Sequence, residues 1–170
     1  MNTKNKIAGL KILLAAGFLL VLLNSVPIVN AQQNEIKWHP FEEAISLAQE
    51  TGKPILVDVW APWCGWCRKL KKEVYPKLSA ELEKYILTRL NREDNKTTVR
   101  FQGKNLTPLR IAQKIKAETV PTITVLNSDA NYLIHLSGFM KSESLQPVLS
   151  YIASGEYKKN PLRSTCKKGS

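Results

Sequence analysis

Two cysteines separated by two residues, Cys64 and Cys67, directly follow an apolar run over residues 54–60. The only polar residue in that run is Asp58, and such a run is typical of a strand covered on both faces of a sheet. Beyond the cysteines, apolar residues recur every four positions from Leu70, which marks the buried side of a helix. The chain therefore predicts a strand that delivers a cysteine pair to the start of a helix.

This placement favours redox chemistry at the cysteine pair. Two cysteines at this spacing can close a disulfide ring with little backbone movement. At the start of a helix, the sulfur of Cys64 also gains unpaired backbone N–H donors and the positive end of the helix dipole. Both effects favour the thiolate, which is the species that attacks disulfides.

The residues alone leave two other uses of the pair open. One is a static disulfide, although structural bridges usually tie distant segments and enclose longer loops. The other is a zinc site, which needs about two further ligands. The remaining candidate ligands are scattered along the chain: Cys166, His39 and His135. We therefore expect no bound metal and no other cofactor.

Residues 1–31 have the pattern of a secretory signal peptide. Lys4, Lys6 and Lys11 give a basic start, residues 12–23 are uniformly apolar, and small residues precede a cleavage point after Ala31. The apolar stretch is short for a membrane span, which needs roughly 20 residues. The pattern predicts a cleaved signal and a periplasmic or secreted protein; the alternative is an uncleaved N-terminal membrane anchor.

The remainder of the chain is basic, with 22 Lys and Arg residues against 14 Asp and Glu residues, a net charge of +8. Basic residues are interleaved with acidic ones along predicted helices, as in the segment 68–73, Arg-Lys-Leu-Lys-Lys-Glu. This pattern is typical of a solvated helix face with some attraction for acidic partners or an anionic membrane. Because export also argues against it, we expect no nucleic-acid partner.

The rest of the chain alternates between strand and helix patterns. Pro76 is expected to break the helix that follows the cysteines, because proline cannot donate to the helical ladder. The expected elements are an entry strand at 35–39, a helix from Phe41 that stops at Gly52, a strand at 54–60, the cysteine helix with a second piece at 79–85, a strand at 86–90, an insertion at 91–106 with a small hairpin, a helix at 108–117, paired strands at 122–126 and 132–136, a helix at 142–153 and a basic disordered tail at 157–170.

The segment 58–67, Asp-Val-Trp-Ala-Pro-Trp-Cys-Gly-Trp-Cys, resembles the active-site segment of the thioredoxin superfamily. Residues 119–122, Thr-Val-Pro-Thr, resemble the cis-proline loop of that family, and Gly138 stands where the family has a glycine after the hairpin. The likeness covers about residues 36–155. It implies an α/β thioredoxin fold, with a central mixed sheet flanked by helices on both faces, over a domain at 32–156.

The resemblance also implies the roles of three residues. Cys64 would be the attacking thiolate, and Cys67, one turn further into the helix, would resolve the mixed disulfide and close the redox-active Cys64–Cys67 bridge. Asp58 would take the proton of Cys67, because burial raises the pKa of a carboxyl group. A lysine near this aspartate in thioredoxin appears here as Arg89, which can stabilise a carboxylate but cannot give up its proton. The residue-based alternative for Asp58 is a strand-end carboxylate that reaches solvent or Arg89.

Substrate contacts are expected around the cysteines. The resemblance implies a cis Val120–Pro121 bond that presents the backbone of Val120 to an extended substrate. Exposed tryptophans would grip flexible partners, whereas Trp60 can equally be a core residue. The residues expected to bind substrate are Trp63, Gly65, Trp66, Val120 and Pro121.

The resemblance therefore implies an extracytoplasmic thiol-disulfide oxidoreductase that reduces disulfides of exported proteins. Its partners would be protein disulfide or dithiol substrates and a membrane-bound electron donor, and the chain is expected to be a monomer. The alternatives are a disulfide oxidase or isomerase with the same residues, and a non-catalytic binding or assembly factor. The dipeptide Gly65-Trp66, in place of the Gly-Pro of cytosolic thioredoxins, leaves the redox direction open.

Overall fold

The structure, a computed structural model, describes residues 36–159. The predicted signal peptide at 1–31 and most of the predicted tail, including Cys166, lie outside the described residues. The described elements are β1 (Trp38–His39), α2 (Phe41–Thr51), β2 (Ile55–Trp60), α3 (Gly65–Lys69), η1 (Leu70–Val74), η2 (Tyr75–Leu78), α4 (Ser79–Leu82), β3 (Ile86–Asn91), β4 (Val99–Phe101), β5 (Lys104–Leu106), α5 (Pro108–Lys114), β6 (Thr122–Leu126), β7 (Tyr132–Ser137), α6 (Ser142–Ala153) and η3 (Glu156–Lys158).

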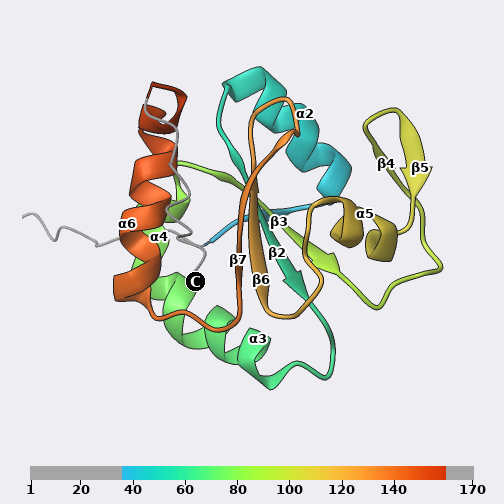
Figure 1. The fold of residues 1–170 in the computed structure, drawn as a ribbon, viewed down its shortest axis with the longest axis horizontal. Helices are drawn as coiled ribbons and strands as arrows, with labels where there is room; N and C mark the ends of the chain where they lie inside the picture. The colour runs from blue at the N-terminus through green and yellow to red at the C-terminus, as the bar shows by residue number, and fades with distance from the viewer. Residues whose placement is uncertain (1–35, 160–170) are drawn as a thin grey trace, which may run out of the picture. The chain divides into compact units, whose positions relative to one another are not determined.

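The centre of the fold is a five-stranded mixed sheet with the order β1-β3-β2-β6-β7 (Figure 1). Strands β1 and β2 both run parallel to β3, and β6 and β7 add antiparallel partners on the other side of β2. Parallel pairing of β2 with β3 follows from the helical crossover between them. The register sets Asp58 of β2 opposite Arg89 of β3.

Helices cover both faces of this sheet. On one face, α2 and α5 pack against Val57 and Val59 of β2. On the other face, the helical segment after the cysteines and α6 pack against Leu56 and Val125 (Figure 1). Alternate residues of β2 thus enter opposite cores, which explains why the strand reads as a continuous apolar run. The α/β architecture predicted from the sequence is confirmed.

The helix that follows the cysteines differs from the prediction. It was expected to break at Pro76, but the regular α-helix already ends at Lys69, and a π-helical turn (η1) and a 3-10 turn (η2) follow. In a regular helix, the ring of Pro76 would clash with the carbonyl group of Lys72, and Pro76 has no N–H to donate to it. The backbone avoids this conflict by widening before Pro76 and tightening around it. The second helical piece is also shorter than predicted and ends at Leu82.

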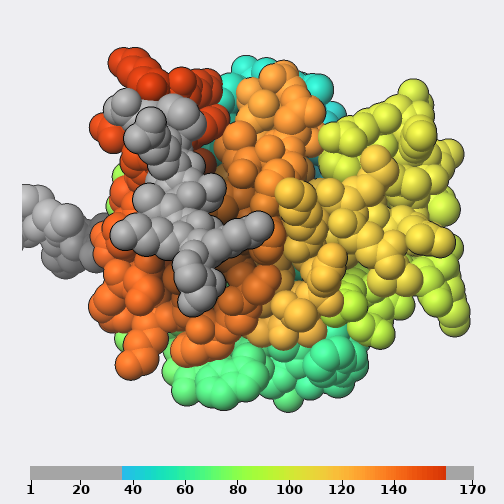
Figure 2. Space-filling model, in the orientation of Figure 1, coloured from blue at the N-terminus to red at the C-terminus, as the bar shows by residue number. Residues whose placement is uncertain are grey.

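The predicted insertion carries the predicted hairpin, formed by β4 and β5. This hairpin projects from one end of the described domain (Figures 1 and 2). It is anchored by Phe101, which is buried and contacts the ring of Phe41 edge-on, with 5.5 Å between ring centroids.

The C-terminal boundary needs a correction. The tail was expected to be disordered from residue 157, but residues 156–158 form the 3-10 turn η3. Tyr157 is partly buried against the core beside α6, because its ring finds apolar partners there. Among residues 36–159, no helix combines the length and the apolar character needed to cross a membrane.

Candidate active site

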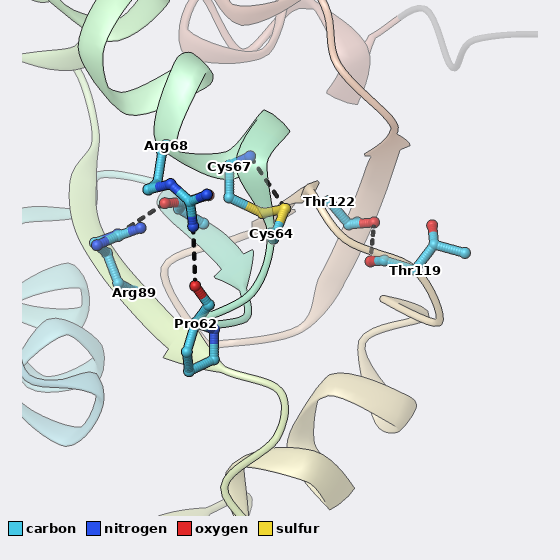
Figure 3. Close-up of a disulfide and its surroundings, with 8 residues drawn as sticks. Pro62, Cys64, Cys67, Arg68, Arg89, Thr119 and Thr122 are labelled. Atoms are coloured by element: carbon cyan, nitrogen blue, oxygen red, sulfur yellow. Dashed lines mark hydrogen bonds and ion pairs between the residues drawn. A yellow bond between two sulfur atoms is a disulfide. The ribbon is translucent and has the colours of Figure 1, made fainter.

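Cys64 and Cys67 are joined in a disulfide at the first turn of α3 (Figure 3). Cys64 is the residue that caps α3, and its Sγ accepts a hydrogen bond from the backbone N–H of Cys67 at 3.0 Å. The same N–H can stabilise a thiolate once the disulfide is reduced, because hydrogen bonds to the charged form favour it. The structure therefore confirms the prediction that a strand leads to a cysteine pair at the start of a helix.

The sulfurs are sheltered, and the exposed surface around them is aromatic. Cys64 and Cys67 have only 3% and 1% of their surface exposed, so the expected difference in access between them is small in the disulfide form. By contrast, Trp63 and Trp66 are 66% and 57% exposed. Large apolar side chains in this position suit contact with a partner surface. Gly65 lies between them and is also exposed.

Arg68 closes the loop that carries the disulfide. Its Nη1 donates a hydrogen bond to the carbonyl oxygen of Pro62 at 3.0 Å (Figure 3). The bond ties the end of the loop after β2 to the first turn of α3, on either side of Cys64. A guanidinium group at this place adds a fixed positive charge near the cysteine pair, which favours a thiolate.

The segment before β6 forms the other side of the site. The Val120–Pro121 peptide bond is cis, as the family resemblance implied. Val120 is partly buried against the cluster that contains both cysteines, whereas Pro121 is buried. The loop is held from two sides. The hydroxyl of Thr122 donates to the carbonyl of Thr119 at 2.7 Å (Figure 3), and Gly138 N–H donates to the carbonyl of Pro121 at 2.8 Å.

Asp58 is fully buried on β2, on the same face as Trp60, which packs against the cysteine cluster. Its Oδ2 accepts a hydrogen bond from Nε of Arg89 at 2.8 Å. The guanidinium of Arg89 lies over the rings of Trp60 and Trp38, at 4.7 and 5.7 Å from their centroids. Burial raises the pKa of Asp58, and Arg89 opposes this rise only in part. The carboxylate therefore both pairs with Arg89 and keeps the character of a base.

Tyr75 completes this buried group. Its ring contacts Trp38, with centroids 5.4 Å apart, and the residue is almost fully buried. Neither the hydroxyl of Tyr75 nor Oδ1 of Asp58 makes a hydrogen bond within the described residues. The two groups nevertheless affect each other: burial and the charge of Asp58 raise the pKa of Tyr75, and Tyr75 in turn lowers the pKa of Asp58.

Replacing Tyr75 with phenylalanine is expected to raise the pKa of Asp58, because the hydroxyl group favours the ionised carboxylate. The free energy of unfolding should change by no more than about 1 kcal/mol in either direction, because the change removes both a buried polar atom and its stabilisation of the carboxylate. The pKa can be followed through the carboxyl carbon resonance of Asp58, and the stability by denaturant unfolding. An Asp58 titration curve identical to that of the unaltered protein would show that Tyr75 does not act on the carboxylate.

The two histidines considered as zinc ligands contact other side chains. Nδ1 of His39 lies 2.7 Å from Oε1 of Glu43, and Nδ1 of His135 lies 2.6 Å from the hydroxyl of Tyr132. Within residues 36–159, no three His, Cys, Asp or Glu side chains are grouped so that they could hold a metal ion.

Sequence reasoning placed the cysteines, Asp58 and Arg89 but missed Tyr75, Arg68 and Phe139. Phe139 contacts the exposed ring of Trp66, with 5.1 Å between centroids. Arg68 could have been predicted as part of the site, because it is a basic residue directly after the second cysteine. No comparable signal existed for Tyr75, since it turns toward the sheet only through the π-helical turn, in which its N–H donates to the carbonyl of Leu70.

Comparison with known proteins agrees with this geometry. The family model described as a thioredoxin-like domain matches residues 41–153. The thiol:disulfide interchange protein DsbD of Vibrio vulnificus is 25% identical over 115 residues, which cover 65% of this chain and 17% of that protein. A thioredoxin of Pyropia yezoensis is 28% identical over 101 residues, covering 59% of this chain and 81% of the relative.

Among solved structures, the thioredoxin of Thermus thermophilus superposes with a TM-score of 0.55 at 21% identity, over 73% of this chain and 95% of that one. This likeness bears on the fold alone. The chain spans less than a fifth of the length of DsbD. By name, DsbD is a thiol:disulfide interchange protein, and the present chain carries the Cys64–Cys67 disulfide. Because the family model covers most of residues 36–159, the chain belongs to the thioredoxin-like domain family.

Proposed function

We propose that this protein is an extracytoplasmic thiol-disulfide oxidoreductase that reduces disulfides in exported proteins. The observation that carries the proposal is the disulfide Cys64–Cys67 at the capping position of α3, bordered by two exposed tryptophans. A structural bridge would have no need of an aromatic rim open to a partner. A binding factor would have no need of a buried carboxyl group on the strand that leads to the disulfide.

The catalytic cycle transfers two electrons from the protein to its substrate. The Cys64 thiolate attacks one sulfur of the substrate disulfide, forms a mixed disulfide and expels the other substrate sulfur as a thiolate. The Cys67 thiol then loses its proton, and its thiolate attacks the sulfur of Cys64. This second attack closes the Cys64–Cys67 disulfide and releases the remaining substrate sulfur as a thiolate. A dithiol donor must then reduce the protein again.

Asp58 is the base that we propose for the second attack. Its carboxylate lies on the strand that leads into the cysteine loop, and its burial raises its pKa. A base whose pKa is raised toward the working pH takes a proton more effectively than an ordinary carboxylate. Arg89 holds the carboxylate by one oxygen, Oδ2, and leaves Oδ1 without a hydrogen bond in the described structure.

The compartment and the donor are proposed from the N-terminal sequence. Residues 1–31 have the order of basic, apolar and small residues that marks an exported protein. Signal cleavage and retention as an anchor would both place the domain outside the cytoplasm. We therefore propose a membrane-bound dithiol as the electron donor. The active form is a monomer in this proposal, with flexible protein disulfides as substrates at the rim formed by Trp63 and Trp66.

The reduction potential of the Cys64–Cys67 couple tests the proposed direction. We expect a value near about −270 mV, as for a reducing thioredoxin, when the protein is equilibrated with glutathione or dithiothreitol buffers. A value near about −120 mV, which is typical of a strong protein oxidant, would overturn the reductant proposal in favour of an oxidase. A value near about −180 mV would favour an isomerase.

A further inference from the structure

A cleft of about 380 Å³ lies beside the cysteine helix. It is formed by the end of α3 and the η1–η2 segment on one side and by the chain that enters α6 on the other. Three lysines from these two segments line it: Lys69, Lys77 and Lys141. We call this feature the lysine cleft. Three lysines that converge from separate segments suit an anionic ligand more than an apolar one.

The acidic residues of the cleft do not neutralise these lysines fully. Glu73 lies 3.9 Å from Lys69, at the limit of an ion pair, and Glu143 accepts a hydrogen bond from Ser142 at 3.0 Å. Neither Lys77 nor Lys141 has a carboxylate within 4 Å among the described residues. Glu143 is close enough to Lys77 and Lys141 to interact with their charges. With three lysines against two glutamates, the cleft therefore keeps one net positive charge that is available to a carboxylate from outside.

The lysine cleft is continuous with the aromatic rim of the disulfide. The ammonium group of Lys69 lies 5.3 Å from the ring centroid of Trp66 and 5.5 Å from that of Phe139. Lys69 and Phe139 belong both to the wall of the cleft and to the contacts of the exposed Trp66. A polypeptide lying over Trp66 would thus reach the lysines in the same binding event.

The charge of the chain itself argues against an occupant from this protein. Residues 160–170 contain Arg163, Lys167 and Lys168 and no acidic residue, and the only acidic residue in 1–35 is Glu35, against three lysines. A second copy of the chain would bring its own net positive charge to the cleft. The occupant that complements the cleft is therefore an acidic segment of another protein.

We propose that the lysine cleft binds an acidic segment of the partner protein and so selects disulfides that are flanked by Asp or Glu residues. The inference rests on the proposed function, since it names the class of substrate for the same disulfide. Attraction between opposite charges speeds encounter and is weakened by salt. Substrates with acidic flanks should accordingly react faster than substrates with basic flanks, and the difference should shrink as salt is added.

The test uses two synthetic peptides of equal length, each with one internal disulfide, flanked on both sides by glutamates in one and by lysines in the other. The reduced protein is mixed with each peptide, and the second-order rate of reduction is measured at low and at about 0.5 M salt. We expect the acidic peptide to react about ten times faster at low salt, and the ratio to approach one at high salt. Equal rates at low salt would overturn the inference and leave the proposed function intact.

Reversing the charge of cleft lysines tests whether the preference for the acidic peptide comes from the lysine cleft. In the double variant Lys77→Glu and Lys141→Glu, the preference should reverse toward the basic peptide, which a merely misfolded protein would not show. The matched control, Lys104→Glu with Lys114→Glu, makes the same change in net charge on exposed positions of β5 and α5 and should keep the preference for the acidic peptide. A preference retained by the first variant, or lost equally in both, would contradict the lysine cleft as its source. Reduction of neither peptide by the unaltered protein would overturn the proposed function and this inference together.

Discussion

Replacing Cys64 with serine is expected to abolish the reduction of protein disulfides, with a loss on the order of a thousandfold or more. The reason is that Cys64 supplies the attacking sulfur, and a serine hydroxyl is not ionised near neutral pH and cannot form a mixed disulfide. The rate is measured with a protein disulfide such as that of insulin, with dithiothreitol as the electron source. The fold should survive the change, because serine has nearly the size of cysteine.

The Cys67→Ser variant is the matched control for this result. It keeps Cys64 and should still attack substrate, but it lacks the sulfur that resolves the mixed disulfide. It should therefore accumulate covalent complexes with its substrates, which are visible on non-reducing gels and disappear on reduction. Complexes that form through Cys67 in the Cys64→Ser variant instead would reverse the assigned roles. If neither variant forms complexes and both keep their binding partners, the protein acts as a binding factor.

Replacing Asp58 with asparagine is expected to slow disulfide reduction about 10- to 100-fold near pH 7, the range usual for the loss of a positioned base. The deficit should become smaller as the pH rises, because Cys67 then loses its proton to water without help. The rate of mixed-disulfide resolution, followed by rapid mixing from pH 6 to pH 10, measures both effects. Asp129→Asn makes the same chemical change at an exposed turn and should leave the rate unaltered.

The same Asp58→Asn change should stabilise the fold, and the sign of this effect follows from the pKa. Burial raises the pKa of Asp58 in the folded protein above its ordinary value of 3.8. The folded state thus holds this proton more tightly than the unfolded state does, and stability falls as the pH rises from 3.8 through the raised pKa. Asparagine does not titrate, so it adds no such pH dependence to stability. The free energy of unfolding of the variant should therefore exceed that of the unaltered protein by an amount that grows from pH 3.8 to the raised pKa and stays constant at higher pH.

A slower rate together with a more stable fold would separate the catalytic role of Asp58 from a structural one. An unchanged rate at pH 7 would remove the carboxylate from the mechanism. A variant that is less stable at neutral pH would show instead that the pair with Arg89, at 2.8 Å, outweighs the cost of burying the charge.

Much of the fold was predictable from residue patterns because each element has a strong local cause. Strand β2 is uniformly apolar since both of its faces are covered, and α2 ends where Gly52 adopts a left-handed conformation, with φ of 69°. Thr107 caps α5 through its side chain, with Pro108 in the first helical position, as those residue types favour. The residue patterns predicted the ends of helices less accurately. The helical segment α4, for example, ends at Leu82, earlier than its pattern indicates.

The candidate site was predictable where its residues are neighbours in sequence and less so where the fold assembles them. Cys64, Cys67 and Trp66 lie in one short segment, and the pairing of Asp58 with Arg89 follows from the register of two adjacent parallel strands. Tyr75 could not be placed, because a π-helical turn changes which side of the helix faces the sheet. The lysine cleft could not be predicted from the sequence either, because its walls come from segments that lie far apart along the chain.

The proposed chemistry requires the sulfur of Cys64 to be ionised at neutral pH once the disulfide is reduced. Its most direct test is the rate at which iodoacetamide modifies each cysteine of the reduced protein between pH 5 and pH 9, with mass spectrometry to assign the site. A free cysteine, with a pKa of about 8.5, is only a few per cent thiolate at pH 7. We predict that Cys64 is modified about five to ten times faster than free cysteine at pH 7, while Cys67 stays unmodified. Modification of Cys64 no faster than free cysteine, or modification of Cys67 first, would contradict the account.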